Sequence, residues 1–184
     1  MKRTIDFITA FLFLFLLSPL LLGVGAAVAT TSRGGALFFQ DRVGRGGRLF
    51  RIVKFRSMFV GAERAGPLFT RDGDPRITPV GRFIRRTSLD ELPQLINVLK
   101  GDMSLVGPRP DVPSQQPLYS PEEWAERHLV RPGLTGLAQA TLRSQATAEQ
   151  RKELDLHYVR ENSFLMDAKI VALTVKQIIL KGGN

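Results

Sequence analysis

The chain of 184 residues is long enough for one domain of ordinary size and a short attachment segment. Its 26 Lys and Arg residues outnumber 17 Asp and Glu residues, and the net charge of +9 predicts an anionic partner: nucleic acid, lipid headgroups or a phosphorylated substrate. The chain has no Cys and only two His residues, which excludes disulfides, thiolate nucleophiles, Cys-ligated zinc and a His-rich metal site. Any chemistry must therefore come from carboxylates, basic groups and hydroxyls.

Residues 7–29 form an almost wholly apolar segment, long enough for a helix of roughly 34 Å that reaches across a hydrocarbon core. A secretory signal peptide, a transmembrane helix and a re-entrant helix all fit it. Pro19 follows Ser18 near the middle and predicts a kink, because proline removes a helical hydrogen bond. Basic residues flank both ends and prefer the cytoplasmic side, so we favour a re-entrant helix over residues 1–32, broken at Ser18-Pro19.

Two short strands, Leu37-Phe38-Phe39 and Leu49 to Phe55, are predicted next, joined across a glycine-rich turn at residues 44–47. Lys54 and Arg56 are two residues apart and therefore point to the same side of the second strand, where they face either phosphates or water. Asp72-Gly73-Asp74-Pro75 superficially resembles a calcium loop, but the later ligands are absent at the right spacing. We expect a turn there.

Helices are predicted over most of the remaining chain. Thr78-Pro79 begins the first, with Thr as N-cap and Pro at the first position. The apolar stripe of this helix is expected at Val80, Phe83 and Ile84, and its basic side at Arg82, Arg85 and Arg86.

A second helix covers about Leu92 to Leu99, with Pro93 in its first turn. Ser120 with Glu123, and Thr147 with Gln150, have the spacing of a capping box and predict two further helix starts. The apolar tail from Phe164 to Lys181 is either a core helix or a helix in the membrane interface. The fold class is therefore α+β and mostly helical, with a small β element.

Two adjacent carboxylates, Asp90 and Glu91, lie at or just before a helix N-terminus. One interpretation is structural, since Ser88 and Glu91 have capping-box spacing and acidic groups favour the positive end of the helix dipole. The other is chemical: both carboxylates project into a basic, phosphate-binding site, where one attacks phosphorus and its neighbour helps to hold a divalent cation. Mg²⁺ suits such a site because it binds few carboxylates together with substrate phosphates.

Two Arg-Pro turns follow the carboxylates. Pro108-Arg109-Pro110 holds its arginine on a stiff, extended backbone, which suits a bidentate phosphate ligand but also an ordinary solvated turn. Arg131-Pro132-Gly133-Leu134-Thr135-Gly136 contains two glycines that permit close backbone approach, and it too is open to an ordinary structural interpretation.

Taken together and in this order, four stretches resemble the monotopic phosphoglycosyl transferases, also called bacterial sugar transferases. The stretches are Lys54-Phe55-Arg56-Ser57-Met58, residues 88–104, Val106-Gly107-Pro108-Arg109-Pro110, and residues 131–136. The resemblance covers essentially the whole chain and is to the small, single-domain branch. One departure is Leu137, which stands where many relatives carry Trp after the Thr-Gly pair.

The resemblance implies a re-entrant membrane helix over residues 1–32 and a cytoplasmic catalytic domain over residues 33–184, with interfacial amphipathic helices and a short β-hairpin. It implies that Asp90 is the nucleophile and Glu91 its catalytic partner, with Mg²⁺ held by both carboxylates. The candidate substrate-binding residues are Lys54, Arg56, Arg85, Pro108, Arg109, Pro110, Arg131 and Thr135.

The implied reaction moves a sugar 1-phosphate from a UDP-sugar to polyprenol (undecaprenyl) phosphate and releases UMP, through a covalent aspartyl-phosphosugar intermediate. It is the first membrane step of glycoconjugate or polysaccharide assembly, on the cytoplasmic face of the bacterial inner membrane. The expected partners are the UDP-sugar, polyprenol phosphate and membrane lipid, and no nucleic acid.

Two other classes compete with this interpretation. The charge alone favours a membrane-anchored nucleic-acid-binding protein, but that function needs a basic stripe with aromatic residues for stacking, and the Phe residues fall mostly in apolar runs. A phosphatase of lipid carriers would release inorganic phosphate without a sugar donor.

Overall fold

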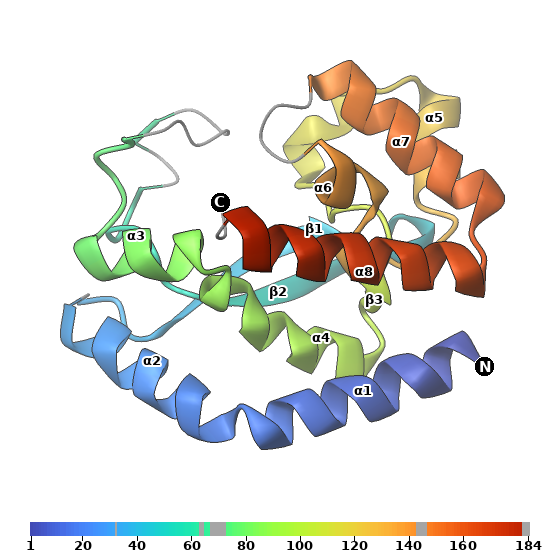
Figure 1. Cartoon of the computed structure of the whole chain (residues 1–184). Helices are drawn as coiled ribbons and strands as arrows, with labels where there is room; N and C mark the ends of the chain where they lie inside the picture. The colour runs from blue at the N-terminus through green and yellow to red at the C-terminus, as the bar shows by residue number, and fades with distance from the viewer. Residues whose placement is uncertain (32, 63–64, 67–72, 143–146, 182–184) are drawn as a thin grey trace.

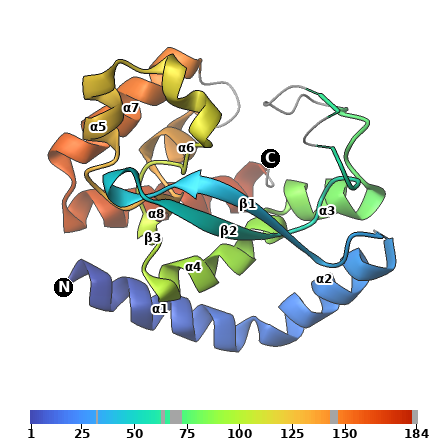
Figure 2. The same ribbon diagram turned by 180° about the vertical axis from the view of Figure 1, so that it is seen from behind.

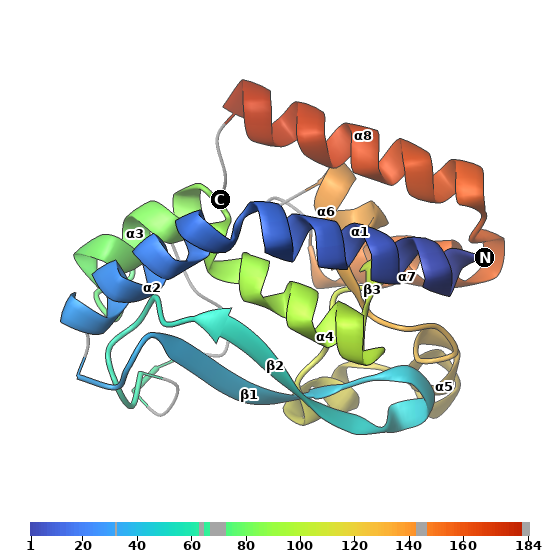
Figure 3. The same ribbon diagram turned by 90° about the horizontal axis from the view of Figure 1, so that it is seen from below.

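The computed structural model describes residues 1–31, 33–62, 65–66, 73–142 and 147–181. A bent pair of N-terminal helices lies along one side of the molecule, a twisted β-hairpin crosses its middle, and the C-terminal helix runs in the same direction as the first helix (Figures 1 and 3). The elements are α1 (Lys2–Leu16), α2 (Ser18–Thr31), β1 (Leu37–Val43), β2 (Leu49–Phe55), α3 (Pro79–Arg86), α4 (Leu95–Lys100), β3 (Ser104–Val106), α5 (Pro121–Arg127), β4 (Gly133–Thr135), α6 (Leu137–Thr141), α7 (Ala148–Glu161) and α8 (Phe164–Lys181), with 3₁₀ helices η1 (Arg45–Gly47), η2 (Leu89–Gln94) and η3 (Pro113–Leu118).

The predicted kink in the N-terminal segment is present. Helix α1 ends at Leu16, α2 begins at Ser18, and the two axes bend by 65°. Pro19 has no N–H to offer the carbonyl of Phe15 four residues earlier, and the Ser18 hydroxyl donates to that carbonyl instead, at 2.8 Å. Within the described residues, no helix by itself has the length and apolarity to cross a bilayer, whereas α1 and α2 have both when taken together across the bend.

One face of the helix pair is apolar and exposed. The exposed fractions of its large apolar side chains run from 42% at Ile5 to 75% at Leu22. The face also carries Phe7, Ile8, Phe11, Leu12, Phe13, Phe15, Leu16 and Leu20. Contiguous apolar surface of this kind marks an interaction with membrane or protein rather than with water.

The start of α1 is bound to the rest of the molecule by polar contacts. The Arg3 guanidinium donates to the carbonyls of Val98 and Leu99 at the end of α4, at 2.5 and 2.7 Å. Asp6 is buried and accepts hydrogen bonds from the Ser104 hydroxyl at 2.8 Å and from the Leu105 N–H at 3.1 Å. Lys2 pairs with Asp167 on α8. These contacts fix the position of α1 relative to α4, β3 and α8.

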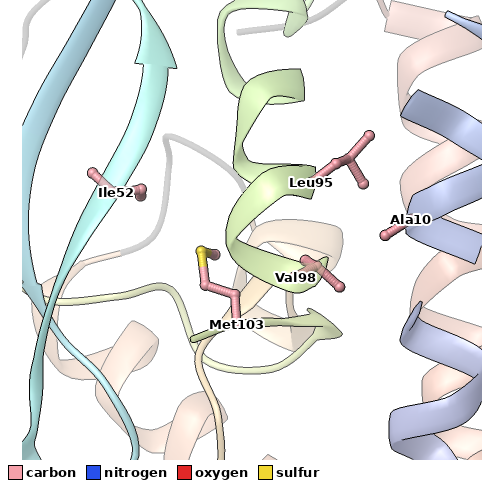
Figure 4. Close-up of a cluster of buried hydrophobic side chains, with 5 residues drawn as sticks. All are labelled: Ala10, Ile52, Leu95, Val98 and Met103. Carbon is pink, nitrogen blue, oxygen red and sulfur yellow. The ribbon is translucent and has the colours of Figure 1, made fainter. Parts of the chain in front are cut away.

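The core beside this helix is built around α4, which lies between the hairpin and α1 (Figure 4). Leu95 and Val98 of α4 pack with Ala10 of α1, Ile52 of β2 and Met103, and all five side chains are at most 2% exposed. Burial of side chains of this size stabilises the fold by about 1.5–3 kcal/mol each.

A fully buried amide, Asn97, joins α4 to the hairpin. Its side chain accepts from the Val53 N–H at 3.0 Å and donates to the Arg51 carbonyl at 2.8 Å. The amide therefore satisfies two main-chain groups of β2 that face away from β1. This pairing sets the distance between β2 and the helical segment that contains the adjacent carboxylates.

The antiparallel hairpin is confirmed, with register from Leu37 opposite Phe55 to Val43 opposite Leu49 (Figure 2). Its first strand continues to Val43, beyond the predicted end at Phe39. A second, parallel pair joins β3 and β4 and was not predicted, because each strand has only three residues. There Gly133 permits the expected close approach: a Cβ on it would lie 2.1 Å from the Gly107 nitrogen.

The predicted helix starts are confirmed at three positions. Thr78 caps α3 by accepting from the Gly81 N–H at 2.9 Å, and capping boxes at Ser120 and Thr147 begin α5 and α7. The apolar side chains predicted for one stripe of α3 differ in burial: Ile84 is buried, whereas Phe83 is 54% exposed.

The second predicted helix is shorter than expected. The α-helix begins at Leu95 rather than Leu92, and Pro93 lies in the preceding 3₁₀ helix η2. The C-terminal helix α8 follows the predicted range; Ile170 is buried, whereas Phe164 and Leu165 are exposed. It thus contributes to the core and also presents apolar side chains outward.

The segment that superficially resembles a calcium loop is described only in part, since Asp72 lies outside the described residues. Asp74 forms an ion pair with Arg76 at 2.6 Å, and the neighbouring described residues form turns. Hydrogen bonds from Arg76 lower the pKa of Asp74 to about 2. The described part agrees with the predicted turn.

We expect Asp6→Ala to lower the free energy of unfolding by about 2 kcal/mol, because it leaves the buried Ser104 hydroxyl and Leu105 N–H without an acceptor. Chemical unfolding in one detergent measures the difference. The matched control is Asp41→Ala on β1, whose side chain is exposed and for which we expect a change within about 0.5 kcal/mol. Equal unfolding midpoints for the Asp6 variant and the wild type would contradict a structural role for this carboxylate.

Candidate active site

The two adjacent carboxylates lie on η2, directly after a strained turn. Ser88 has φ 56° and ψ 16°, and it is the one non-glycine residue with a positive φ in the described part of the chain. Its side chain makes no capping hydrogen bond, so the capping-box interpretation of Ser88 and Glu91 is wrong. The left-handed turn redirects the chain after α3 and leaves the Glu91 side chain available for other partners. Such strain is concentrated at functional sites.

Glu91 joins two cations from separate segments. Its Oε1 accepts from the Lys54 Nζ at 2.8 Å and from an Arg109 Nη at 2.9 Å. Lys54 comes from β2, and Arg109 from the loop that follows β3. Three of the predicted site residues therefore meet at one oxygen atom.

Asp90 is 9% exposed, and no described residue donates a hydrogen bond to its carboxylate. Burial, followed by the negative charge of Glu91, raises the pKa of Asp90 to about 6. Burial alone would also raise the pKa of Glu91, but the charges of Arg109 and Lys54 outweigh it and lower that pKa well below its ordinary value. The two carboxylates therefore differ: Glu91 stays ionised at neutral pH, whereas Asp90 has a pKa closer to neutral pH.

Further basic residues surround the dyad. The charges of Lys54, Arg85 and Arg109 all favour the ionised form of Asp90. Arg85 lies in the last turn of α3, with an Nη 3.5 Å from the Ser57 hydroxyl. Burial is the largest cause that lowers the pKa of Lys54, while Glu91 opposes it. This arrangement suits a dianionic or pyrophosphate ligand.

Three predicted substrate-binding residues are engaged elsewhere. Arg56 donates to the carbonyls of Gly34 and Leu37 at 2.8 and 3.0 Å, where it holds the segment that precedes β1. Arg131 donates to the Gly101 carbonyl at 2.8 Å, and the Thr135 hydroxyl lies 2.8 Å from that of Thr174 on α8. These contacts support the fold around the site and do not reach the dyad.

Sequence reasoning missed Arg42, on β1, as part of this region. One of its Nη atoms donates to the Pro110 carbonyl at 2.8 Å, and the other to the Gln40 side chain at 2.6 Å. Burial and then the charge of Arg109 lower the pKa of Arg42 to about 10. An arginine near the end of a predicted strand carries no signal of its own, because the tertiary contact that gives it a role joins segments far apart in the chain.

The donor set fits a magnesium ion. Both oxygens of Asp90 and the Oε2 of Glu91 lack a described donor, and hard carboxylate oxygens are the ligands that Mg²⁺ prefers. No cluster of three or more His, Cys, Asp or Glu side chains suited to a metal occurs among the described residues. Asp90 and Glu91 would therefore hold the ion with water and substrate phosphates as its remaining ligands, as is usual for Mg²⁺.

Comparison with known proteins decides the family. The family model described as bacterial sugar transferase matches residues 1–181. The chain belongs to the bacterial sugar transferase family. The resemblance of the four stretches to this family is thereby confirmed.

Three relatives of this sugar transferase illustrate the range of named activities and chain lengths. The UDP-N-acetylgalactosamine-undecaprenyl-phosphate N-acetylgalactosaminephosphotransferase of Aeromonas hydrophila is 42% identical, over 97% of this chain and 43% of that protein. The UDP-glucose:undecaprenyl-phosphate glucose-1-phosphate transferase of Escherichia coli (strain K12) is 45% identical, over 95% of this chain and 39% of that protein. An uncharacterized sugar transferase of Bacillus subtilis (strain 168) is 43% identical, over 100% of this chain and 89% of that protein. The chain thus spans less than half the length of the first two relatives.

The raised pKa of Asp90 makes its stability contribution dependent on pH. Below the unfolded pKa of about 4 both states are protonated, and the protonated carboxyl costs the fold nothing. As the pH rises through about 6, the folded state must accept a buried charge, and that stability is lost. In metal-free buffer with EDTA we expect Asp90→Asn to be more stable than the wild type at pH 8, by up to about 3 kcal/mol, and equally stable at pH 4.

Unfolding of both proteins in one detergent at the two pH values measures this difference. Asp41→Asn, at an exposed position, serves as the matched control and should show no such pH dependence. If Asp90→Asn were destabilised at pH 8, the wild-type carboxylate would have stabilising partners, contrary to the site described above.

Proposed function

We propose that this sugar transferase is an enzyme that moves a sugar 1-phosphate from a UDP-sugar to polyprenol (undecaprenyl) phosphate and releases UMP, as the first membrane step of glycoconjugate or polysaccharide assembly. The names of the Aeromonas hydrophila and Escherichia coli relatives support this donor class and acceptor. The observation that carries the proposal is Asp90, a buried carboxylate without a described partner beside a glutamate that is fixed by two cations.

The proposed reaction has two steps. An Asp90 oxygen attacks the β-phosphorus of the UDP-sugar, the bond from that phosphorus to the bridging oxygen breaks, and UMP leaves with the bridging oxygen. A phosphate oxygen of the polyprenol phosphate then attacks the phosphorus of the aspartyl-phosphosugar. The bond between this phosphorus and the Asp90 oxygen breaks, which regenerates the carboxylate and leaves a diphosphate-linked sugar on the lipid. A covalent intermediate suits two substrates that arrive from different phases.

The surrounding residues serve this chemistry by charge and position. Lys54 and Arg109 are held by Glu91, so their positive charges are already in place when charge builds up on the transferring phosphoryl group. Arg85 adds a third cation on the α3 side. The low exposure of Asp90 restricts water that would hydrolyse the acyl phosphate. Bound Mg²⁺ would supply neutralisation of phosphate charge at Asp90 and Glu91.

The N-terminal helix pair is proposed to lie in the cytoplasmic leaflet as a re-entrant helix. Its outer face is apolar and exposed, its bend lies at Leu17 directly before Ser18-Pro19, and the start of α1 is bound to the domain. Residues 33–184 would then form a cytoplasmic catalytic domain, whose dyad meets the lipid phosphate at the headgroup level and the nucleotide sugar from the cytosol.

The two-step reaction predicts UMP release when donor is supplied without lipid acceptor, in an amount approaching one per enzyme molecule. Asp90→Asn should abolish this release and lower turnover roughly 10³-fold or more, because an amide does not displace at phosphorus. A donor panel of UDP-sugars, with UMP measured by chromatography, provides the test, and Asp41→Asn is the matched control. Near-normal turnover in Asp90→Asn would contradict the covalent step. Release of inorganic phosphate instead of UMP would indicate a phosphatase.

Magnesium dependence is tested separately. Excess EDTA should stop UMP release, and added Mg²⁺ should restore it, because two carboxylates at one site hold an ion with the substrate phosphates. The control is the same concentration of EDTA saturated with Mg²⁺ beforehand. Full activity in excess chelator would rule out the metal.

The re-entrant arrangement predicts that both ends of the apolar segment lie in the cytoplasm. Single cysteines at the exposed positions Thr4→Cys and Arg33→Cys are clean probes, since the chain has no native Cys. Both should be protected from an impermeant thiol reagent that is added to intact cells, and both should react once the cells are opened. Labelling of Thr4→Cys alone in intact cells would show a helix that passes through the membrane.

A further inference from the structure

The Pro108-Arg109-Pro110 turn is held by its carbonyl groups. Proline has no N–H, so Arg109 supplies the only backbone donor of these three residues. The backbone of the turn is therefore held mainly through its carbonyl groups, which accept hydrogen bonds from other segments. The Gly133 N–H donates to the Pro108 carbonyl at 2.8 Å. An Arg127 Nη donates to the Arg109 carbonyl at 2.9 Å, and an Arg42 Nη to the Pro110 carbonyl at 2.8 Å. Each carbonyl of the turn is therefore bound from a different segment.

Arg127 is a buried cation that two carboxylates hold in place. It is the last residue of α5 and 2% exposed, and it pairs with Asp111 and with Asp155 of α7, the latter at 2.5 Å. A buried guanidinium needs such partners, because an unpaired charge in the interior is very costly. The Nη that meets Asp155 is also the one that donates to the Arg109 carbonyl. The network that joins α5 to α7 thus ends on the main chain of the active-site arginine.

Arg42 approaches the turn from the hairpin. Its second Nη binds Gln40, two residues earlier on the same strand, which orients the guanidinium toward Pro110. The positive charge of Arg109 lies close enough to lower the pKa of Arg42, so the two like charges oppose each other. The charges of Asp111 and Glu91 act in the opposite direction and offset the repulsion. The hairpin and the turn are kept together by the contact of Arg42 with the Pro110 carbonyl and by the Val43 N–H, which donates to the Asp111 carbonyl at 2.9 Å.

We propose that Arg42 and Arg127 are positioning residues for Arg109: from β1 and α5 they hold the carbonyls of Pro110 and Arg109, so that the Arg109 guanidinium meets Glu91. Neither donates a hydrogen bond to Asp90 or Glu91, so their effect on the position of the dyad passes through Arg109. The charge of Arg42 also acts on Glu91 directly, and this contribution remains in the Arg109→Met background. The expected effect on the reaction rests on the proposed function. The expected effect on the mobility of the turn rests on the hydrogen bonds alone. A displacement of about 1 Å at a catalytic group lowers rates by up to about 10²-fold.

The decisive experiment is a double-mutant cycle. UMP-release kcat and KM are measured for the wild type, Arg42→Met, Arg109→Met and the double variant, with thermal unfolding to confirm that each is folded. Arg42→Met should lower kcat about tenfold with a smaller change in KM, and it should have almost no further effect in the Arg109→Met background. The control is Arg48→Met, at an exposed position in the hairpin turn, which should leave kcat unchanged. Independent, additive losses for Arg42 and Arg109 would overturn the proposal.

Arg127 needs a milder change, because its removal leaves Asp111 and Asp155 buried without a cation. Arg127→Lys retains the charge, but a single ammonium cannot reproduce the fork that reaches both carboxylates and the Arg109 carbonyl. A folded Arg127→Lys protein should show the same loss of kcat, again absent in the Arg109→Met background. Unchanged kcat in a folded Arg127→Lys protein would contradict its part in the proposal.

A measurement without turnover separates this proposal from the proposed function. The Gly133 N–H donates to the Pro108 carbonyl at 2.8 Å, and its hydrogen exchange reports how firmly the turn is held. We expect exchange about tenfold faster in Arg42→Met and unchanged in Arg48→Met. Unchanged exchange in Arg42→Met would refute the positioning role even if the enzyme were active. Faster exchange would uphold it even if no UDP-sugar released UMP.

Discussion

The double ion pair of Glu91 is the interaction on which the site depends. One carboxylate oxygen receives Lys54 from the hairpin and Arg109 from the proline-rich turn, so three separate parts of the chain meet at a single atom. The charges of Arg109 and Lys54 favour the ionised form of Glu91, whereas burial and then the negative charge of Glu91 make ionisation of Asp90 more difficult. Two chemically similar side chains thus acquire different roles from their surroundings alone.

The ion pairs of Glu91 explain two locally unfavourable features of the backbone before and within η2. Ser88 adopts a left-handed backbone conformation that glycine would accept more readily, and the turn it makes leads into a 3₁₀ helix rather than an α-helix. The short helix presents Asp90 to the interior and Glu91 to the two cations. A capped α-helix with Glu91 bonded back to Ser88 would be locally more stable, but it would remove Glu91 from Lys54 and Arg109.

The N-terminal helix pair and the site are parts of one structure. Asp6 on α1 binds β3, and the chain that leaves β3 leads directly to Arg109. On the other side, α4 is packed between α1 and the hairpin that carries Lys54 (Figure 4). A movement of α1 relative to the domain would therefore reach the dyad through two routes, both of them packed and hydrogen-bonded.

Features that depend on local physics could be predicted from the amino-acid sequence. They are the apolar N-terminal segment and its break near Pro19, the hairpin, the caps at Thr78, Ser120 and Thr147, and the family motifs with their two adjacent carboxylates. Capping and turn signals act over a few residues and can be read from the chain. The meeting of Glu91 with Lys54 and Arg109, which lie 37 and 18 residues away, was decided only by the tertiary structure. So were the structural contacts of Arg56, Arg131 and Thr135, and the contact of Arg42 with the turn. A lone arginine has the same sequence signature whether it faces a phosphate, a carbonyl or water, because its partner is chosen by the packing of distant segments.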